Sequence, residues 1–402
     1  MRNPVNLPAV EMSEAWWRYP QATMQPLIDG GQRAAYVPQL GAPMFLRYSE
    51  CRAGLADERL GAMGARYFEL QGWTEGAFVT WTRRNVVMLD PPDHDRLRRL
   101  VNRAFTPRQV ERIRPMIQRI VGELANEVAA AGQVEFMHHF ARLVPLRVIC
   151  ELLGVPFIDQ EHMHRWTEAL SRAAGMPNAE ERRAGDAAME EFNAYVLAMI
   201  AERRRRPSDD LLTALIQAEE TGDRLSNDEL VAMVVQLQFA GHETTRNLIG
   251  NGLYTLLKRP EEFARLRANR SLVPGAVDEM LRFEPPITFT SRIAKEPMSI
   301  AGVRIDPGQF VVLMLALANR DPERFENPNR FDVGRLDNDH LSFGHGIHYC
   351  LGANLARIEG VSVFTTLLDR FRSIELAGEE SDWAAWTPLR GRERLEVRVV
   401  PT

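Results

Sequence analysis

The feature that most constrains the fold is a segment predicted to form one unusually long helix. It begins after Ser226, where Ser-Asn-Asp-Glu229 has the capping-box pattern, and no helix breaker follows before Pro260. The helix at 227 to 258 would be roughly 32 residues or about 48 Å long. Because its first half, LVAMVVQLQFA, is apolar nearly all round, we expect it to cross the protein interior.

The centre of this helix interrupts its own apolar pattern. The sequence there is Ala240-Gly241-His242-Glu243-Thr244-Thr245. Gly241 would let a bulky group lie against the backbone, and Thr244 can bond back to the carbonyl of Ala240 and loosen the helix locally. The segment alone also fits a core helix with a polar patch at a helix crossing.

Composition and periodicity indicate a single large domain over residues 1–402. With 402 residues and 45% hydrophobic content the chain can bury a large core, and it shows no repeats and no dividing linker. Helical periodicity dominates from about 93 to 283, where Thr106-Pro107 should open one helix and Pro207-Ser208 should separate two others. β-rich stretches are expected mainly at about 34–60 and 286–400. We therefore predict a mainly α fold with a small β-rich region.

Charge and cysteine content exclude several classes. A net charge of -5 and a pI near 6.1 argue against a general nucleic-acid binder. Three widely spaced cysteines do not suggest a disulfide framework, which fits a reducing cytoplasm. The N-terminal sequence lacks a signal-peptide pattern, and the longest apolar run, at 310–318, is half a membrane span. We expect a soluble cytoplasmic protein without a membrane partner.

A lone cysteine, Cys350, stands in the sequence FGHGIHYCLGANLARIEG at 343–360. A zinc site with His345 and His348 would lack a fourth ligand at matching spacing. A nucleophilic cysteine with His348 as base would lack the surrounding signature of known cysteine enzymes. A buried inert thiol is the simplest interpretation of Cys51 and Cys150.

Glu279 and Arg282 are predicted to lie on one face of a helix that starts near Pro274 and ends before Pro285. Such a pair is most often solvated. A buried network would need a third member, for which the sequence DPERFENPNRFDVGR at 321–335 offers Arg330.

Together these motifs resemble the cytochrome P450 superfamily, of the soluble bacterial type. Residues 343–352 are similar to its haem-binding loop at every characteristic position, and residues 240–245 to its oxygen-binding motif. Glu279 and Arg282 with Arg330 resemble its Glu-Arg-Arg triad. DPPDHDRLRRLVNRAFTP, at 90–107, resembles the helix whose His and Arg hold the haem propionates. The resemblance covers roughly residues 35–400.

The resemblance implies a haem-thiolate monooxygenase with haem b as cofactor and O2 as co-substrate, the haem lying between the long helix and the helix after the cysteine. Cys350 would be the proximal iron ligand, and its thiolate would favour O-O cleavage. Glu243 and Thr244 would be the acid and alcohol that deliver protons. His242 is expected to support Glu243 or a neighbouring helix. The other implied cofactor-binding residues are His94, Arg98, Arg292 and His348 for the propionates, and Ala240, Gly241, Phe343, Gly344 and Gly352. Gly346 and Gly352 would permit the close approach of the backbone.

Electrons must come from a separate donor, because the sequence shows no dinucleotide, flavin or iron-sulfur motif. The resemblance implies a ferredoxin served by a ferredoxin reductase. Candidate contacts for this acidic partner are Arg99, Arg103, Arg108, His345 and Arg357. The basic run Arg203–Arg206 is more simply a solvated helix end. A monomer is expected.

The substrate is expected to be a mid-sized, mainly apolar small molecule, such as a secondary metabolite, terpenoid, steroid or polyketide. Two alternatives stay open: a peroxide-using or non-oxidative haem-thiolate enzyme, and a non-catalytic haem sensor. The candidate pocket residues, assigned by the same resemblance, are Met233, Gln236, Leu237, Ile287, Thr288 and Trp386.

Overall fold

The computed structural model describes residues 7–105, 111–220 and 223–402. The chain divides into two compact units. We call residues 1–61, 121–141 and 244–402 the sheet unit, and residues 62–120 and 142–243 the helical unit. The division falls inside two helices, α8 (Arg114–Ala131) and α13 (Asn227–Leu257). The single domain over 1–402 stays a prediction.

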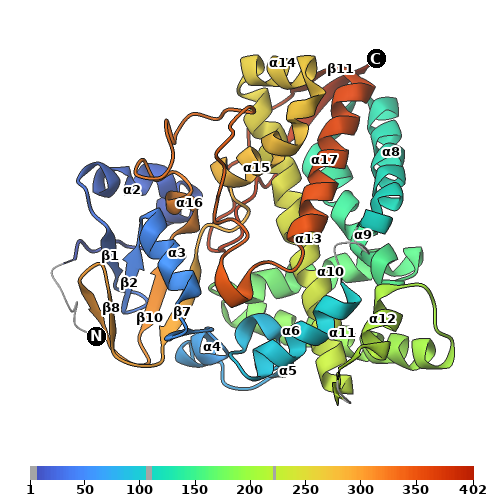
Figure 1. Cartoon of the computed structure of the whole chain (residues 1–402). Coiled ribbons are helices and arrows are strands. Elements are labelled where there is room, and N and C mark those ends of the chain that lie inside the picture. Colours follow the sequence, from blue (N-terminus) through green and yellow to red (C-terminus); the bar gives the residue numbers. More distant parts are fainter. Residues whose placement is uncertain (1–6, 106–110, 221–222) are drawn as a thin grey trace. The chain divides into compact units, whose positions relative to one another are not determined.

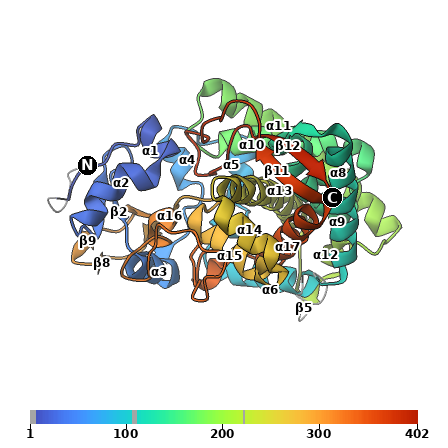
Figure 2. The ribbon, with the colours of Figure 1, turned by 90° about the horizontal axis from the view of Figure 1, so that it is seen from above.

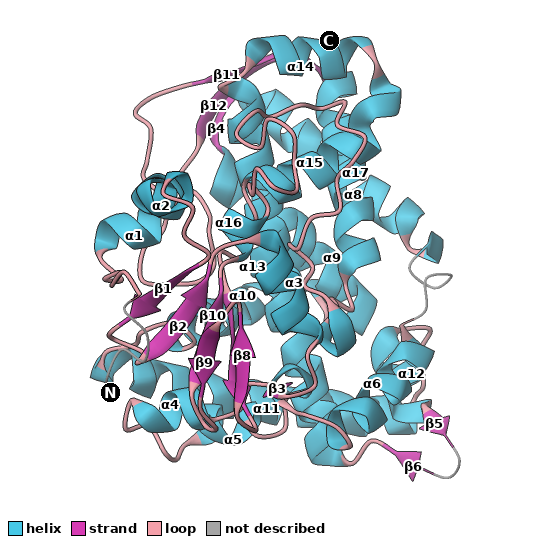
Figure 3. Ribbon diagram, turned by 60° about the vertical axis from the view of Figure 1, so that its left-hand side comes forward, coloured by secondary structure: helices cyan, strands magenta, loops and turns pink. Residues whose placement is uncertain are grey.

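A five-stranded sheet is the main β structure of the sheet unit (Figures 1 and 3). Its order is β1-β2-β10-β7-β3, with β2 and β10 parallel and the other pairs antiparallel. Every residue of β1, β2 and β10 is buried, so these strands are continuous apolar runs rather than alternating ones. The bounds are β1 Ala34–Val37, β2 Ala42–Phe45, β3 Leu60–Gly61, β7 Thr290–Ala294 and β10 Phe310–Leu313.

Helices and smaller sheets complete the sheet unit. Helix α17 (Ala353–Arg370) packs beside α15 (Val273–Phe283), as Figures 1 and 2 show. A Cβ at Gly360 of α17 would lie 2.9 Å from Val277, so a side chain there would separate the two helices. The other elements are α1 Glu14–Arg18, α2 Pro20–Asp29, α3 Tyr48–Ala56, α14 Pro260–Ala268, α16 Leu315–Ala318, β4 Gln133–Glu135, β8 Met298–Ile300, β9 Val303–Ile305, β11 Phe371–Leu376 and β12 Glu396–Pro401.

The helical unit is built on α10 (Gln160–Ala173) and α11 (Ala179–Arg205), which pack closely together. A Cβ at Gly185 of α11 would lie 2.6 Å from the Cβ of Ala173, which explains the small residues at this crossing. A capping box starts α11, since the Asn178 side chain accepts from the backbone N-H of Glu181 and the Glu181 side chain returns a bond. The remaining bounds are α4 Arg66–Leu70, α5 Ala77–Thr82, α6 Asp93–Ala104, α9 Leu143–Leu153, α12 Leu211–Gln217, β5 Glu219–Glu220 and β6 Asp223–Arg224.

The long helix predicted from the sequence is confirmed as α13, which has 31 residues. Its capping box forms as expected, because the backbone N-H of Ser226 donates to Glu229 Oε2 at 2.8 Å and that of Glu229 donates to Ser226 Oγ at 3.3 Å. Residues 230–236 are all buried. The expected loosening at 240–245 does not interrupt the helical assignment.

The broad division into helical and β-rich regions is confirmed, with two additions. Strand β4 lies inside the region predicted to be helical, and it pairs with β12 near the C-terminus. The short strands β5 and β6 lie in the same region and pair with each other. The Pro207-Ser208 break lies between α11 and α12 as predicted, whereas Thr106-Pro107 lies outside the described residues. Among the described helices, none combines the length and apolar character that a membrane span needs.

Glu279 of α15 is a carboxylate with no exposed surface. Arg282, also fully buried, donates from Nε to Glu279 Oε2 at 2.7 Å and from Nη2 to Oε1 at 2.8 Å. Its Nη1 donates to the carbonyls of Asn319 and Pro328 at 2.8 and 2.9 Å. Breaking such a pair is costly, because the remaining charge would stay buried without compensation. The predicted pair is thus a buried bidentate one.

The prediction that the Arg330 side chain is the third member of this network is wrong. Arg335 takes that place, with its Nε 3.1 Å from Glu279 Oε2. Arg330 is exposed and contributes its carbonyl oxygen, which accepts from Arg282 Nη2 at 3.2 Å and from Arg335 Nη2 at 3.1 Å. The chain reverses at Asn327, which has a left-handed φ of 47° and accepts from the Arg330 N-H at 2.9 Å. Arg330 therefore presents its backbone to the network and its side chain to solvent.

Replacing Arg335 by alanine should lower the free energy of unfolding by about 3 kcal/mol, because a buried carboxylate loses one of its two cations. Arg330→Ala is the matched control and should change this free energy by less than about 0.5 kcal/mol, as is usual for exposed side chains. Urea unfolding followed by circular dichroism measures both. Equal destabilisation by the two variants would contradict the assignment of Arg335.

Candidate active site

The loop before α17 presents Cys350 at the surface of the sheet unit. Its thiol is exposed, and its backbone N-H donates to the Phe343 carbonyl at 2.9 Å, which closes the loop. Gly344 and Gly346 have left-handed φ values of 71° and 73°. A Cβ at Gly346 would lie 2.7 Å from the carbonyl oxygen of Leu55, so this loop conformation requires glycine there.

Cys350 lies three residues before the first residue of α17, a helix of 18 residues. Backbone N-H groups at a helix N-terminus favour a nearby negative charge such as a thiolate. Burial, by contrast, raises the pKa of the Cys51 thiol far above its ordinary value and that of Cys150 to about 12. Both are fully buried, which confirms their interpretation as inert thiols and leaves Cys350 as the exposed one.

The Phe343 side chain anchors the cysteine loop to the protein interior. Its side chain is buried, and the guanidinium carbon of Arg357 lies 4.6 Å from its ring centroid. Arg357 Nε also donates to Asp278 Oδ1 of α15 at 2.8 Å, and His340 Nε2 lies 3.3 Å from the same oxygen. The loop is therefore held to both α15 and α17.

Two predicted propionate ligands lie one turn apart on α6, in the helical unit. His94 is 2% exposed, and its Nδ1 lies 2.8 Å from Asp95 Oδ1. Arg98 is half-buried. A histidine and an arginine at this spacing share one helix face and could both contact an anion.

The other two predicted propionate ligands belong to the sheet unit. Arg292, on β7, is buried, and its Nη1 donates to Ser291 O at 3.0 Å and to Thr290 Oγ1 at 3.3 Å. His348 is half-buried in the turn that precedes Cys350. Both roles stay predictions.

At the centre of α13 the structure shows how Glu243 is held. His242 has no exposed surface, and its Nδ1 lies 3.3 Å from Glu243 Oε1 and 3.2 Å from Thr167 Oγ1 of α10. The expectation that His242 supports Glu243 or a neighbouring helix is confirmed on both counts. Glu243 and Thr244 are themselves half-buried, and their role in proton delivery stays a prediction.

The same part of α13 has one exposed side. Ala240 is exposed although Gln238 and His242 have no exposed surface. A Cβ at Gly241 would meet Ile149 of α9 at 3.5 Å, an ordinary contact distance. The space beside Gly241 is thus occupied by α9, and the open side of the helix is that of Ala240.

The candidate pocket residues form one group in each unit. In the helical unit, Met233 is buried, Leu237 is half-buried, and the Gln236 carboxamide oxygen accepts from Asn85. In the sheet unit, Thr288 Oγ1 donates to the Pro388 carbonyl at 3.2 Å, which brings residues 287–288 against the turn at 386–389. Their roles in substrate binding stay predictions.

An aromatic cluster next to Trp386 was missed in the sequence. Trp16 and Trp17 of α1 lie 5.6 and 5.8 Å from the ring of Phe289, and Trp17 lies 6.4 Å from Trp386. Trp386 is 50% exposed and has a left-handed φ of 62°. The available signal was the pair of tryptophans three and four residues after the N-cap Ser13.

These residues fit a haem b group. An exposed thiol stands on a loop that only glycines can form, a buried aromatic side chain supports that loop, and cationic side chains for two propionates are present. A carboxylate in an apolar site needs such cations and hydrogen bonds.

Comparison with known proteins decides the assignment. The family model for cytochrome P450 matches residues 62–382. The chain belongs to the cytochrome P450 family. It is 40% identical over 393 residues to Cytochrome P450 107B1 of Saccharopolyspora erythraea, which covers 95% of this chain and 94% of that protein.

Two further relatives are named for their chemistry or pathway. The 6-deoxyerythronolide B hydroxylase of Saccharopolyspora erythraea is 39% identical over 363 residues, 88% of this chain and 89% of that one. The solved structure of the bacillaene polyketide synthase cytochrome P450 PksS of Bacillus subtilis 168 matches with a TM-score of 0.88 and 33% identity, over 100% of both chains. The protein is thus a P450 monooxygenase that binds haem b, uses O2, receives electrons from a redox partner and acts on a small molecule.

Replacing Cys350 by serine should abolish the strongly red-shifted Soret band of the reduced, carbon monoxide-bound P450, because serine cannot supply a thiolate. Cys51→Ala and Cys150→Ala are the controls, and both should keep the band. Difference spectra of the dithionite-reduced proteins measure this. A red-shifted band that persists in Cys350→Ser would rule out Cys350 as the ligand.

Proposed function

We propose that this P450 hydroxylates or otherwise oxidises a polyketide-type secondary metabolite, with Glu243 and Thr244 as its proton pathway. The observation that carries the proposal is the carboxylate of Glu243, which is half-buried on a buried helix and held by His242. Neither a haem sensor nor an enzyme that uses peroxide directly needs such a proton donor.

Cys350 would ligate the haem iron, and His94, Arg98, Arg292 and His348 would hold the propionates. The bound haem supplies oxygen activation at an iron whose electron density the thiolate raises. Phe343 supports the loop from its buried side and limits the access of water to the sulfur.

Proton delivery would be the work of two neighbouring side chains. The carboxyl group of Glu243 takes up a proton from the solvent side, and its contact with His242 Nδ1 keeps Oε1 in place. The Thr244 hydroxyl passes a proton on toward the reacting oxygen. A single relay of this kind is needed, because uncontrolled water in the pocket would divert electrons from product formation.

In Thr244→Ala, electron consumption should continue while the amount of product per electron consumed falls severalfold, because the relay loses its last hydroxyl. Thr245→Ala is the matched control, since Thr245 is buried on another face of α13, and it should keep the ratio near that of the parent protein. Parallel measurement of electron consumption and product gives the ratio. Full coupling in Thr244→Ala would refute the relay.

The substrate class is supported by the relatives and by the apolar character of the candidate pocket. One relative is named for hydroxylation of 6-deoxyerythronolide B, and another belongs to a polyketide synthase. Aromatic and aliphatic side chains dominate the two pocket groups, including Met233, Leu237, Ile287 and Trp386, with few polar groups to fix orientation. A macrolactone with scattered hydroxyls has matching chemistry.

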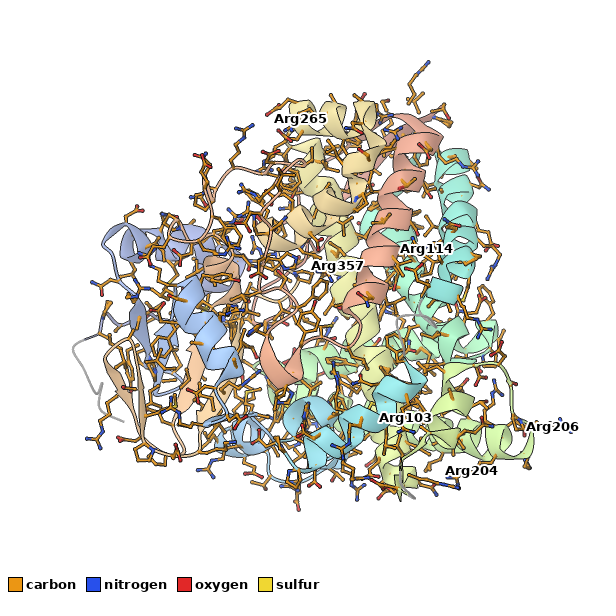
Figure 4. The ribbon with its side chains drawn as sticks, in the orientation of Figure 1. Arg103, Arg114, Arg204, Arg206, Arg265 and Arg357 are labelled. Carbon is orange, nitrogen blue, oxygen red and sulfur yellow. The ribbon has the colours of Figure 1, made fainter. Side chains whose placement is uncertain are left out.

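Electrons would come from a ferredoxin and its reductase in the cytoplasm, and the enzyme would act as a monomer. Arg99 and Arg103 are exposed on α6, and Figure 4 shows Arg103 there and Arg357 on α17. Arg108 lies outside the described residues. Arg357 is already paired with Asp278, so it would contribute charge rather than a new direct contact.

The test is reconstitution with a ferredoxin, its reductase and a macrolactone substrate. We expect a shift of the ferric haem toward high spin on substrate addition and an oxygenated product, and a reduction rate that falls steeply with salt. Peroxide alone, and a steroid of similar size, serve as controls and should give little product. A high-spin shift and product with the steroid but not with the macrolactone would overturn the substrate class, and salt-insensitive reduction would overturn the acidic donor.

A further inference from the structure

Three ligand groups of the helical unit converge beside the centre of α13. One ring nitrogen of His164, one of His242 and a carboxylate oxygen of Glu243 lie within 4.8 Å of one another. His164 comes from α10, whereas the other two are neighbours on α13. Two imidazoles and one carboxylate form a ligand set typical of divalent transition metals.

The contacts within this group are close to those of a metal centre. The His242 Nδ1 and Glu243 Oε1 atoms are 3.3 Å apart, and ligand atoms of a tetrahedral zinc ion are separated by about 3.3 Å. The rings of His164 and His242 meet edge-on, with centroids 5.3 Å apart and planes at 89°. One ring nitrogen of His164 lies within 4.8 Å of the other two ligand atoms.

His164 offers a donor atom that the protein leaves unused. Its Nδ1 is buried and has no hydrogen-bond partner within the described part of the chain. An imidazole nitrogen is among the commonest ligand atoms of zinc, so this buried nitrogen is available to a metal ion.

His242 is linked to α10 by a hydrogen-bond contact. Thr167 Oγ1 lies 3.2 Å from His242 Nδ1 and 3.0 Å from the Met163 carbonyl, so the hydroxyl bridges this ring and the backbone of α10. The two helices that would supply the ligands are therefore held together beside the proposed site.

We propose that His164, His242 and Glu243 bind one Zn²⁺ ion, with water in the fourth position. The ion would join α10 to α13 and neutralise the carboxylate of Glu243. The consequence for turnover rests on the proposed function: a coordinated Glu243 cannot accept and release protons, so bound Zn²⁺ would inhibit the monooxygenase reversibly.

The experiment is calorimetric titration of the haem-loaded protein with Zn²⁺ in a buffer that does not bind metals. We expect one ion per chain. His164→Ala and His164→Asn should each weaken binding by more than about tenfold, since even partners outside the ligand shell account for roughly 10- to 100-fold. His162→Ala is the matched control, because His162 is exposed on the same helix, and its affinity should equal that of the parent protein.

Absence of stoichiometric binding, or equal affinities in the parent protein and both His164 variants, would overturn the site. Thermal melting followed by circular dichroism confirms that the variants are folded. Product formation with and without Zn²⁺, reversed by a chelator, is the second readout. A protein that binds Zn²⁺ but oxidises no substrate would refute the proposed function alone, whereas one that turns over without binding Zn²⁺ would refute the site alone.

Discussion

The sheet unit depends on the buried ion pair between Glu279 and Arg282. Neither side chain has exposed surface, so each must be satisfied by protein groups. Arg282 donates hydrogen bonds to backbone carbonyls of the segment around residues 319–330. Glu279 accepts from the backbone N-H of Asp332 at 2.9 Å and from the Asn338 side chain at 3.3 Å. A long segment without regular structure is thereby fixed to α15.

The network continues to the cysteine loop through ordinary hydrogen bonds. Asn319 Nδ2 donates to Ser342 Oγ at 2.8 Å, and its carboxamide oxygen accepts from the Leu341 N-H at 2.7 Å. Ser342 Oγ also donates to the Leu281 carbonyl of α15 at 2.7 Å. Phe343 follows directly, and its carbonyl accepts from Cys350. The position of the thiol therefore depends, through this series of hydrogen bonds, on a buried ion pair. The network of Glu279, Arg282 and Arg335 thus has a structural role.

How much of this could be predicted from the sequence depends on the range of each interaction. The Glu279–Arg282 pair and the capping box of α13 are local, so their spacing was sufficient. Which arginine pairs with Glu279, Arg330 or Arg335, could not be predicted from local spacing. It depends on the turn at Asn327, and no sequence motif indicated the left-handed conformation of that residue. Likewise, the sequence assigned His242 a supporting role but did not identify its partners. Thr167 and His164 lie more than 70 residues away on α10, and local spacing does not predict contacts over that separation. The P450 resemblance supplied roles for residues, whereas the packing of α10 against α13 supplied their contacts.

The surroundings of Glu243 show why one carboxylate can serve two purposes. A proton donor in a dry pocket must stay close to the reacting group, and it must also be able to take up a new proton from solvent. His242, itself in contact with Thr167, restrains the Glu243 carboxylate. The half-burial of Glu243 leaves part of its surface accessible to solvent. The same restraint brings a second imidazole within ligand distance, because His164 lies one turn before Thr167 on α10. The proposed proton transfer and the proposed metal binding would then compete for one pair of carboxylate oxygens, and the availability of Zn²⁺ would control oxygenation without a separate regulatory domain.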